Sequence, residues 1–234
     1  MLQQPLPLYK TADKTFEEFI AGDNTAVLRS VERWASGDGP WFVLLWGKPG
    51  VGKSHLLQAA LRECSRNSQQ AMYLPLRELS GGKADVLDGL DSLAMLGIDD
   101  VDLMIGDLRW ETALFSMFNG LAENGRRLII GTRQNPRFAP FQLPDLQSRL
   151  CSGLSFQLIE LGDEEKKRYL LERAQQKDLA MPSAVADYIV THHGRSLHDL
   201  SSLFERLDTA TLAAGKPLTV PLVKAVINEQ INRA

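Results

Sequence analysis

Cysteine and long apolar runs are scarce in this sequence, and their scarcity excludes several classes of protein. Only Cys64 and Cys151 occur among 234 residues, and neither lies in a CxxC motif or at a metal-ligand spacing. This usage excludes a disulfide framework, and Cys64, which shares an apolar helix face with Leu57 and Leu61, is expected to be a buried, reduced thiol. There is no signal-peptide pattern at the N-terminus, and no apolar run approaches the ~18 residues of a membrane span. The sequence therefore predicts a soluble, cytoplasmic protein.

Net positive charge is also absent, which limits the partners that charge alone could recruit. The formal net charge is −3 and the pI is near 5.8, so no overall basic field is available to hold DNA independently of its sequence. Any contact with nucleic acid would have to be local. Apolar residues make up 44% of the chain, which is enough for one larger domain and a small one.

A glycine-rich stretch at residues 47–54, GKPGVGKS, matches GxxxxGK[ST] at every fixed position. The apolar run 41–46 before it is typical of a buried strand, and the residues after it are helical in period. In this context the backbone N–H groups of the loop and the helix N-terminus converge on one phosphate. Lys53 is expected to reach the β- and γ-phosphates, and Ser54 to offer its hydroxyl to Mg²⁺. The alternative is a glycine-rich turn with a chance lysine. The predicted phosphate site comprises Gly47, Lys48, Pro49, Gly50, Val51, Gly52, Lys53, Ser54 and His55.

Two carboxylates end a strongly apolar run downstream of this loop. Residues 93–100 (LAMLGIDD) predict a strand that ends at Asp99 and Asp100. Acidic residues at the carboxyl end of a central strand are what a Mg²⁺–nucleotide site requires. We expect Asp99 to hold Mg²⁺ through its water shell, and Asp100 to orient or activate the attacking water. An ordinary acidic turn is the alternative.

Strands and helices alternate along the first two thirds of the chain, which predicts an α/β fold with a five-stranded parallel sheet flanked by helices. After residue 161 the pattern becomes purely helical, with Pro182 near the first position of one of four helices. We expect an extended tail at 1–14, an α/β domain at 15–161 in which Asn24 caps a helix, and a helical domain at 162–234. The expected strands are 41–46, 70–76, 93–100, 127–132 and 154–161.

The tail at 1–14 contains two prolines and no helical period, which predicts an extended segment. Leu6 and Leu8 alternate around Pro7, so two apolar side chains could fill neighbouring pockets of a partner while proline reduces the ordering cost. A disordered leader or a strap over the chain's own domain is an equal alternative.

A phosphate loop followed by an all-helical domain resembles the AAA+ class, in which an AAA+ P-loop domain precedes a helical lid. Several stretches are also similar, in order, to the DnaA/Hda family of bacterial replication proteins, and the resemblance covers roughly residues 15–208. DnaA carries a C-terminal helix-turn-helix domain, and this sequence is expected to stop before one. With the QxxLPL-like N-terminus, that makes the chain similar to the short members of the family, which inactivate DnaA while bound to the DNA-loaded sliding clamp. The matching stretches are 16–24 (FEEFIAGDN), 52–59 (GKSHLLQA), 98–101 (IDDV), 118–121 (FNGL) and 148–150 (SRL).

This resemblance implies a regulator that binds ADP or ATP with Mg²⁺. With the β sliding clamp of DNA polymerase III, it would stimulate ATP hydrolysis by the initiator DnaA and so prevent re-initiation of replication. Arg149 falls at the position of the family's arginine finger, which implies a role in trans on DnaA-bound ATP; without the resemblance it would be a surface arginine. Gln3, Leu6 and Leu8 resemble a clamp-binding peptide, from which Pro5 departs. DNA contact would then be indirect, through the clamp, and a homo-oligomer is possible.

The resemblance defines the nucleotide sensors less sharply. His198 falls where the family has an arginine, although Arg195 lies one turn earlier and could serve instead. At the end of the fourth predicted strand the candidates are Gly131, Thr132 and Arg133. The nucleotide-contact candidates outside the phosphate loop are Phe19, Ile20, Thr132, Arg195 and His198.

A second class of function stays open from the sequence: an autonomous AAA+ ATPase, such as a helicase loader acting on single-stranded DNA. Asp100 is one methylene shorter than the glutamate usual in the AAA+ class, which argues against fast intrinsic hydrolysis. The tail also favours the regulator.

Overall fold

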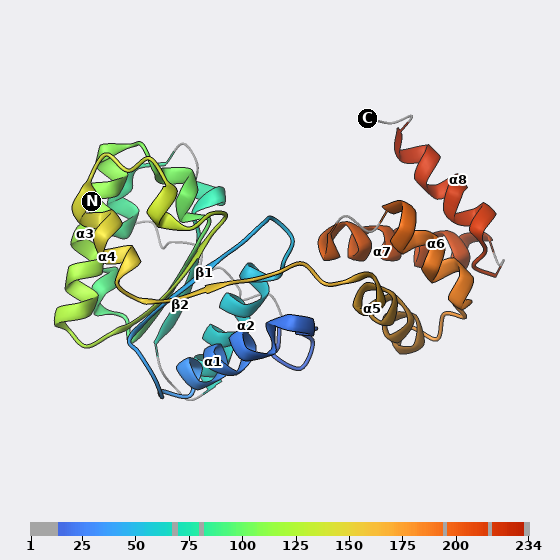
Figure 1. Ribbon diagram of the computed structural model, residues 1–234, viewed down its shortest axis with the longest axis horizontal. Coiled ribbons are helices and arrows are strands. Elements are labelled where there is room, and N and C mark those ends of the chain that lie inside the picture. Colours follow the sequence, from blue (N-terminus) through green and yellow to red (C-terminus); the bar gives the residue numbers. More distant parts are fainter. Residues whose placement is uncertain (1–13, 67–69, 80–81, 194–195, 215–216, 232–234) are drawn as a thin grey trace, which may run out of the picture. The chain divides into compact units, whose positions relative to one another are not determined.

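A computed structural model describes residues 14–66, 70–79, 82–193, 196–214 and 217–231 (Figure 1). These residues divide into two compact units. The first contains Asn24–Lys48 and Gly52–Ile159, and the second contains the chain from Glu160 together with Ile20–Asp23 and Pro49–Val51. Within the described ranges, no helix is both long and apolar enough to cross a membrane.

Five parallel strands form the centre of the first unit, in the order β2-β3-β4-β1-β5. This confirms the five-stranded parallel sheet, although β5 is shorter than the predicted 154–161. Because all strands point the same way, the carboxyl ends of the neighbours β3, β4 and β1 lie at one edge of the sheet. The bounds are β1 Phe42–Trp46, β2 Ala71–Pro75, β3 Met95–Asp99, β4 Arg127–Thr132 and β5 Leu154–Gln157.

Helices cover both faces of this sheet (Figure 1). On one side lie α1 (Thr25–Ala35) and α2 (Lys53–Arg66), and on the other α3 (Leu108–Glu123) and α4 (Pro144–Cys151). Because side chains alternate along a strand, one set of strand residues packs with α3 while the next set faces α2. This two-sided burial explains why the strands read as continuous apolar runs. The core on the α3 side includes Phe42, Leu44, Leu96, Ile98, Leu114, Phe118, Leu128 and Ile130.

Short 3₁₀ helices fill many of the connections between these elements. Three of them, η2, η3 and η4, lie between β2 and β3. They are η1 Gly22–Asn24, η2 Leu76–Leu79, η3 Ala84–Leu87, η4 Leu90–Ser92, η5 Val101–Met104 and η6 Pro136–Phe138.

Asn24 immediately precedes α1, but the prediction that its side chain caps the helix is wrong. The side-chain amide instead bonds the backbone of Ile159: Nδ2 donates to the carbonyl at 2.9 Å, and Oδ1 accepts from the amide at 2.8 Å. An asparagine side chain can cap a helix or hydrogen-bond to a distant part of the chain, so its position in the sequence does not show which of the two it does. In the folded chain Asn24 joins the start of α1 to the segment after β5.

Arg127, at the start of β4, holds the turn between α1 and β1. Its guanidinium donates to the carbonyls of Gly37 at 2.6 Å and Gly39 at 3.2 Å, and also to that of Trp34. Three carbonyl oxygens of one turn are therefore satisfied by a single charged side chain.

The second unit is a bundle of four helices with its own core. Leu170, Ile189 and Phe204 are among its fully buried members. Pro182 lies just before α6 rather than at its first position, and its carbonyl accepts from the amides of Val185 at 2.9 Å and Ala186 at 3.3 Å. The helices are α5 Asp163–Gln176, α6 Ser183–His193, α7 Leu197–Ala214 and α8 Val220–Ile231.

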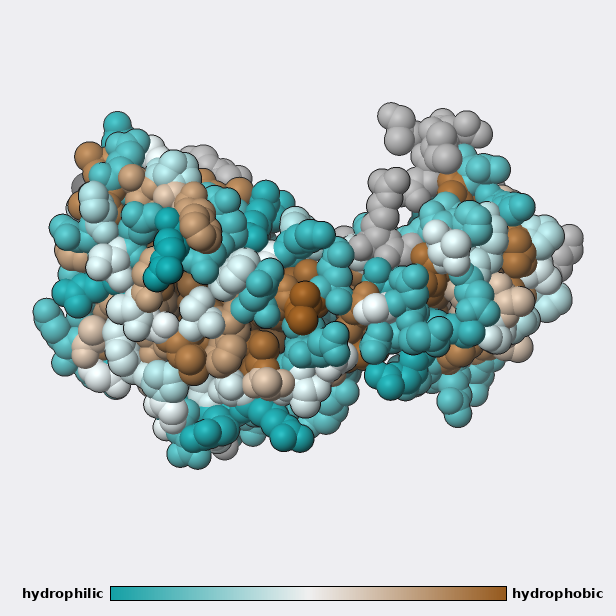
Figure 2. All heavy atoms as spheres, in the orientation of Figure 1, coloured by the Kyte–Doolittle hydropathy of each residue, from teal (hydrophilic) through white to brown (hydrophobic). Residues whose placement is uncertain are grey.

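Hydrophilic and apolar side chains are interspersed on the visible surface of the protein (Figure 2). Both cysteines are free: Cys151 is exposed, and Cys64 is buried as predicted. Burial raises the pKa of the Cys64 thiol to about 12. Among the described residues, the exposed large apolar side chains are Leu103, Leu108, Phe138, Leu154, Ile159 and Leu212.

Candidate functional site

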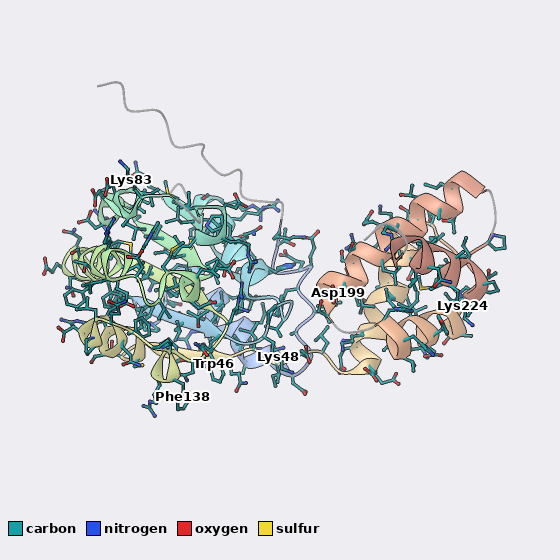
Figure 3. The ribbon with its side chains drawn as sticks, turned by 90° about the horizontal axis from the view of Figure 1, so that it is seen from above. Trp46, Lys48, Lys83, Phe138, Asp199 and Lys224 are labelled. Carbon is teal, nitrogen blue, oxygen red and sulfur yellow. The ribbon has the colours of Figure 1, made fainter. Side chains whose placement is uncertain are left out.

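The predicted phosphate loop connects the end of β1 to the start of α2. Figure 3 labels Trp46, the last residue of β1, and Lys48 in the loop. Gly50 and Gly52 have φ angles of 81° and 100°, a region that side-chain-bearing residues rarely adopt. A Cβ at Gly52 would also lie 2.6 Å from Cε2 of Phe19. These two positions therefore need glycine for backbone shape and, at Gly52, for close packing.

Lys53, the first residue of α2, directs its ammonium group back toward the loop. Nζ donates to the carbonyls of Gly47 at 2.8 Å and Lys48 at 2.9 Å, and the residue is only 6% exposed. Burial lowers the pKa of Lys53, and the nearby carboxylates of Asp99 and Asp100 act in the opposite direction. The ammonium group of Lys53 thus lies against the glycine-rich loop, and its contact with a phosphate stays a prediction.

Asp99 ends β3 and is 2% exposed. Its carboxylate accepts from the hydroxyl of Tyr73 at 2.9 Å on Oδ2 and from the amide of Asp100 at 3.0 Å on Oδ1. Burial, followed by the charge of Asp99, raises the pKa of Tyr73, so this hydroxyl keeps its proton and remains a donor. Each carboxylate oxygen has a second lone pair available.

Tyr73 and Gly131 complete the surroundings of Asp99 and were not predicted for that role. Tyr73 lies on β2, whose pairing with β3 aligns Tyr73 with Gly97 and Pro75 with Asp99. Gly131 on β4 leaves the space that the Asp99 carboxylate occupies, because an added Cβ would collide with Oδ1. Gly131 therefore has a steric role and no side chain to sense a phosphate. A polar tyrosine in an otherwise apolar strand was the available signal for Tyr73.

Asp100 follows Asp99 with a left-handed backbone, φ 56° and ψ 37°. Arg77, just after β2, donates to both of its oxygens, from Nε at 3.0 Å and from Nη2 at 3.2 Å. The guanidinium of Arg133 lies 3.9 Å from Asp100 and 3.3 Å from Asp102. The carboxylate predicted to activate water is therefore paired with arginine. Neither partner was predicted, because their meeting requires β2, β3 and β4 to be neighbours.

Thr132, the last residue of β4, is 1% exposed and lies at the same sheet edge. Its hydroxyl donates to the carbonyl of Gln134 at 2.8 Å, and its carbonyl accepts from the amide of Gly47 at 3.2 Å. Thr132 thus ties β4 to the beginning of the phosphate loop. The lid candidates are not described to the same extent, since Arg195 and the side chain of His198 lie outside the described residues.

Phe19 and His55 pack against each other beside the loop. Their ring centroids are 5.5 Å apart in an edge-to-face arrangement, and His55 Nε2 donates to the carbonyl of Thr15 at 2.7 Å. Burial lowers the pKa of His55 against the opposing effect of that hydrogen bond. Phe19 is buried and Ile20 is partly buried. The segment at 15–19 is therefore fixed to the first turn of α2.

Arg149 is exposed on α4. Leu146 and Leu150, four residues apart, are buried and fix the opposite side of this short helix. The tail candidates Gln3, Leu6 and Leu8 lie outside the described residues.

A glycine-rich GxxxxGK[ST] loop between β1 and α2, an acidic end on β3, a five-stranded parallel sheet and a separate helical unit are the features of the AAA+ class. Two family models match the chain: the bacterial DnaA ATPase domain over residues 11–160, and the lid domain of Hda over residues 163–227. The chain belongs to the DnaA/Hda family of AAA+ proteins.

Solved structures with the same fold include domain III of the Thermotoga maritima initiator DnaA, with 22% identity and a TM-score of 0.82. That match covers 96% of this chain and 98% of the other. DnaA of Aquifex aeolicus bound to AMPPCP has 23% identity and a TM-score of 0.70, covering 82% of this chain and 63% of the other. The Thermotoga maritima branch-migration motor RuvB has 20% identity and a TM-score of 0.71, covering 93% and 72%. The chain thus spans less than two thirds of the longer DnaA chain, and these similarities concern the fold.

Proposed function

We propose that this chain is a nucleotide-binding regulator of replication initiation. With the DNA-loaded sliding clamp, it stimulates ATP hydrolysis by DnaA and so prevents re-initiation. The observation that carries the proposal is the exposed Arg149 on a short helix of a chain that belongs to the DnaA/Hda family.

The residues at the sheet edge fit the phosphates of a nucleotide, and the AMPPCP bound to the similar DnaA supports an adenine base. At Gly50 and Gly52 the loop backbone carries no side chain, and Lys53 provides a cation. Ser54 is exposed, so its hydroxyl is accessible, and Asp99 retains lone pairs for the water shell of a cation. Magnesium typically uses one or two protein ligands together with phosphates and waters. Ser54 and Asp99 would supply the protein ligands. When bound, Mg²⁺ would neutralise phosphate charge.

Arg149 is the group that we assign to the partner's site. Its planar, permanently charged guanidinium suits the charge that develops on a transferred phosphoryl group. An arginine finger raises hydrolysis by ~10³–10⁵-fold in comparable enzymes. Because Arg149 is exposed, it is accessible to a second protein.

The pairing of Asp100 favours regulation over autonomous hydrolysis. Both of its oxygens accept hydrogen bonds from Arg77, which occupies part of the hydrogen-bonding capacity needed to orient an attacking water. An autonomous ATPase such as a helicase loader would need a free base at this position. We therefore expect slow intrinsic turnover, with nucleotide serving mainly to set the conformation of the chain.

The clamp contact is assigned to Gln3, Leu6 and Leu8 on their residue pattern alone. Gln3 would hydrogen-bond at the rim of a pocket, and each fully buried leucine contributes ~1.5–3 kcal/mol. The Leu6→Ala, Leu8→Ala double variant should therefore elute from an immobilised clamp column, whereas the unaltered chain is retained. Equal retention would remove this part of the proposal.

Hydrolysis of DnaA-bound ATP, measured with and without clamp-loaded DNA, tests the function as a whole. Arg149→Ala is expected to keep nucleotide and clamp binding but lose stimulation. Single-stranded DNA and helicase binding that does not depend on the tail, with no effect on DnaA, would favour the autonomous ATPase instead.

A further inference from the structure

We propose that Glu111 is a positioning residue for Arg149, which it serves by fixing the start of α4; the inference rests on the proposed function. Glu111 lies in the first turn of α3 and is 0% exposed. Three backbone amides donate to its carboxylate: Gly106 at 2.7 Å and Gln142 at 3.2 Å to Oε1, and Leu143 at 2.6 Å to Oε2.

Two of these donors immediately precede the helix that carries Arg149. Leu143 is the residue before α4, and Gln142 comes before it. The Gln142 side chain also donates to the carbonyl of Gly106, so the same segment is tied twice to the loop before α3. Burying a carboxylate carries a desolvation penalty that an apolar residue would avoid. In return, the carboxylate of Glu111 fixes the orientation of two consecutive backbone amides, those of Gln142 and Leu143.

The rest of α4 leaves Arg149 dependent on this anchor. The helix has eight residues, and Leu146 and Leu150 form its buried stripe. At about 100° per residue, Gln147 and Arg149 lie on opposite flanks of that stripe. Gln147 Nε2 approaches the carbonyls of Pro136 at 2.9 Å, Arg137 at 3.2 Å and Ala139 at 3.3 Å, and so holds its own flank against η6.

Arg149 therefore projects from the flank that Gln147 does not hold, while Glu111 fixes the helix N-terminus. Leu146, Leu150 and Gln147 restrain the body of the helix, and only its N-terminal end is left to Glu111 among these contacts. A reacting group must stay within about 0.5 Å and 10–20° of its productive geometry. A misplacement of ~1 Å costs about 10²-fold in rate, so losing the anchor should affect the maximum rate of hydrolysis.

Glu111→Gln tests the anchor, because the variant keeps side-chain size but turns one acceptor oxygen into a donor facing backbone N–H groups. The maximum rate of DnaA-bound ATP hydrolysis is expected to fall by about 10- to 100-fold at a saturating concentration of the chain. The half-saturating concentration and nucleotide affinity should not change. Asn24→Ala is the matched control: it removes two backbone hydrogen bonds from a similarly buried side chain outside the α4 segment. An equal loss of maximum rate in both variants would indicate general destabilisation and overturn the proposal.

A double variant separates positioning from an independent structural effect. In the Arg149→Ala background, Glu111→Gln should cause no further loss, because it acts through Arg149. A further, multiplicative loss would contradict the inference. Loss of stimulation with Arg149→Ala but not with Glu111→Gln would overturn the inference alone, whereas full stimulation by Arg149→Ala would overturn the proposed function as well.

Amide hydrogen exchange reports on the anchor without DnaA. The amides of Gly106, Gln142 and Leu143 are expected to be protected in the unaltered chain and to exchange faster in Glu111→Gln. Fast exchange in the unaltered chain would overturn the anchor directly. Should Glu111→Gln not fold, Gln142→Ala removes the exposed tie to Gly106, leaves the carboxylate paired, and should lower the maximum rate by a smaller factor. No change in that variant would then contradict the proposal.

Discussion

Replacing Gly131 by alanine tests how the sheet makes room for the Asp99 carboxylate. A Cβ at Gly131 would collide with Oδ1 of Asp99 and lie 3.6 Å from Cδ2 of Leu57. The carboxylate is 2% exposed and held by Tyr73 and by the amide of Asp100. It therefore cannot move away from the new methyl group without losing one of these hydrogen bonds.

The expected destabilisation follows from those two effects. Overpacking a core position costs ~1–3 kcal/mol, and losing a hydrogen bond to a charged group costs ~1.5–3 kcal/mol. Because the two partly substitute for each other, Gly131→Ala should lower the free energy of unfolding by about 2–5 kcal/mol. It should also weaken Mg²⁺-dependent nucleotide binding, since the carboxylate is displaced.

Urea unfolding followed by circular dichroism measures this change, provided that the slope of free energy with urea is unaltered. Gly125→Ala is the control: its φ of 61° imposes backbone strain of ~1–2 kcal/mol, but nothing lies within 4 Å of the added Cβ. Gly125→Ala should leave nucleotide binding unchanged. A Gly131→Ala protein as stable as the unaltered chain, with normal Mg²⁺-dependent binding, would refute the steric argument.

Three further predictions concern ion pairs and buried groups. Arg127→Ala leaves three carbonyls without their charged donor, so it should lower the free energy of unfolding, measured by thermal unfolding, by about 2–4 kcal/mol. Unchanged stability would contradict the role of Arg127 in holding the turn before β1. The pKa of the Cys64 thiol is about 9.0 in the unfolded chain and about 12 in the folded chain. The unfolded chain therefore loses this proton first, and the free energy of unfolding should fall above pH 9 by up to ~1.4 kcal/mol per pH unit. Urea unfolding at pH 8.5 and pH 10 should show this loss of stability in Cys151→Ala and a smaller loss in Cys64→Ala. An equal loss between the two pH values in both variants would contradict the role of Cys64. The Arg77 side chain is 59% exposed, so Arg77→Ala should change the free energy of unfolding by less than about 1 kcal/mol. It should raise the chain's own rate of ATP hydrolysis, because Asp100 loses its arginine partner. An unchanged basal rate would show that the Arg77–Asp100 pair does not restrain hydrolysis.

The sequence predicted those parts of the fold that depend on local pattern. The apolar run at 41–46, the glycine loop and the helical period after it led to β1, the phosphate loop and α2 with nearly the observed bounds. The purely helical pattern after residue 161 led to the four-helix unit. Each of these signals is a local pattern within consecutive elements, so it does not depend on the tertiary arrangement.

Contacts between segments that are distant in the sequence could not be predicted from local patterns. Asn24 bonds Ile159 across 135 positions, and a local cap was the simplest assignment for such a residue. The pairing of Asp100 with Arg77 depends on the strand order, which puts β2 beside β3. No sequence pattern singles out Glu111, because two of its three amide donors come from a loop 31 and 32 residues away.

A single-turnover measurement of ATP hydrolysis on DnaA tests directly whether Arg149 acts on the ATP bound to DnaA. DnaA preloaded with radiolabelled ATP is mixed with clamp-loaded DNA and a saturating concentration of the unaltered chain, Arg149→Ala or Arg149→Lys. We expect rapid hydrolysis with the unaltered chain only, because lysine lacks the planar guanidinium. Undiminished hydrolysis with Arg149→Ala, in a preparation that still binds nucleotide and clamp, would contradict it.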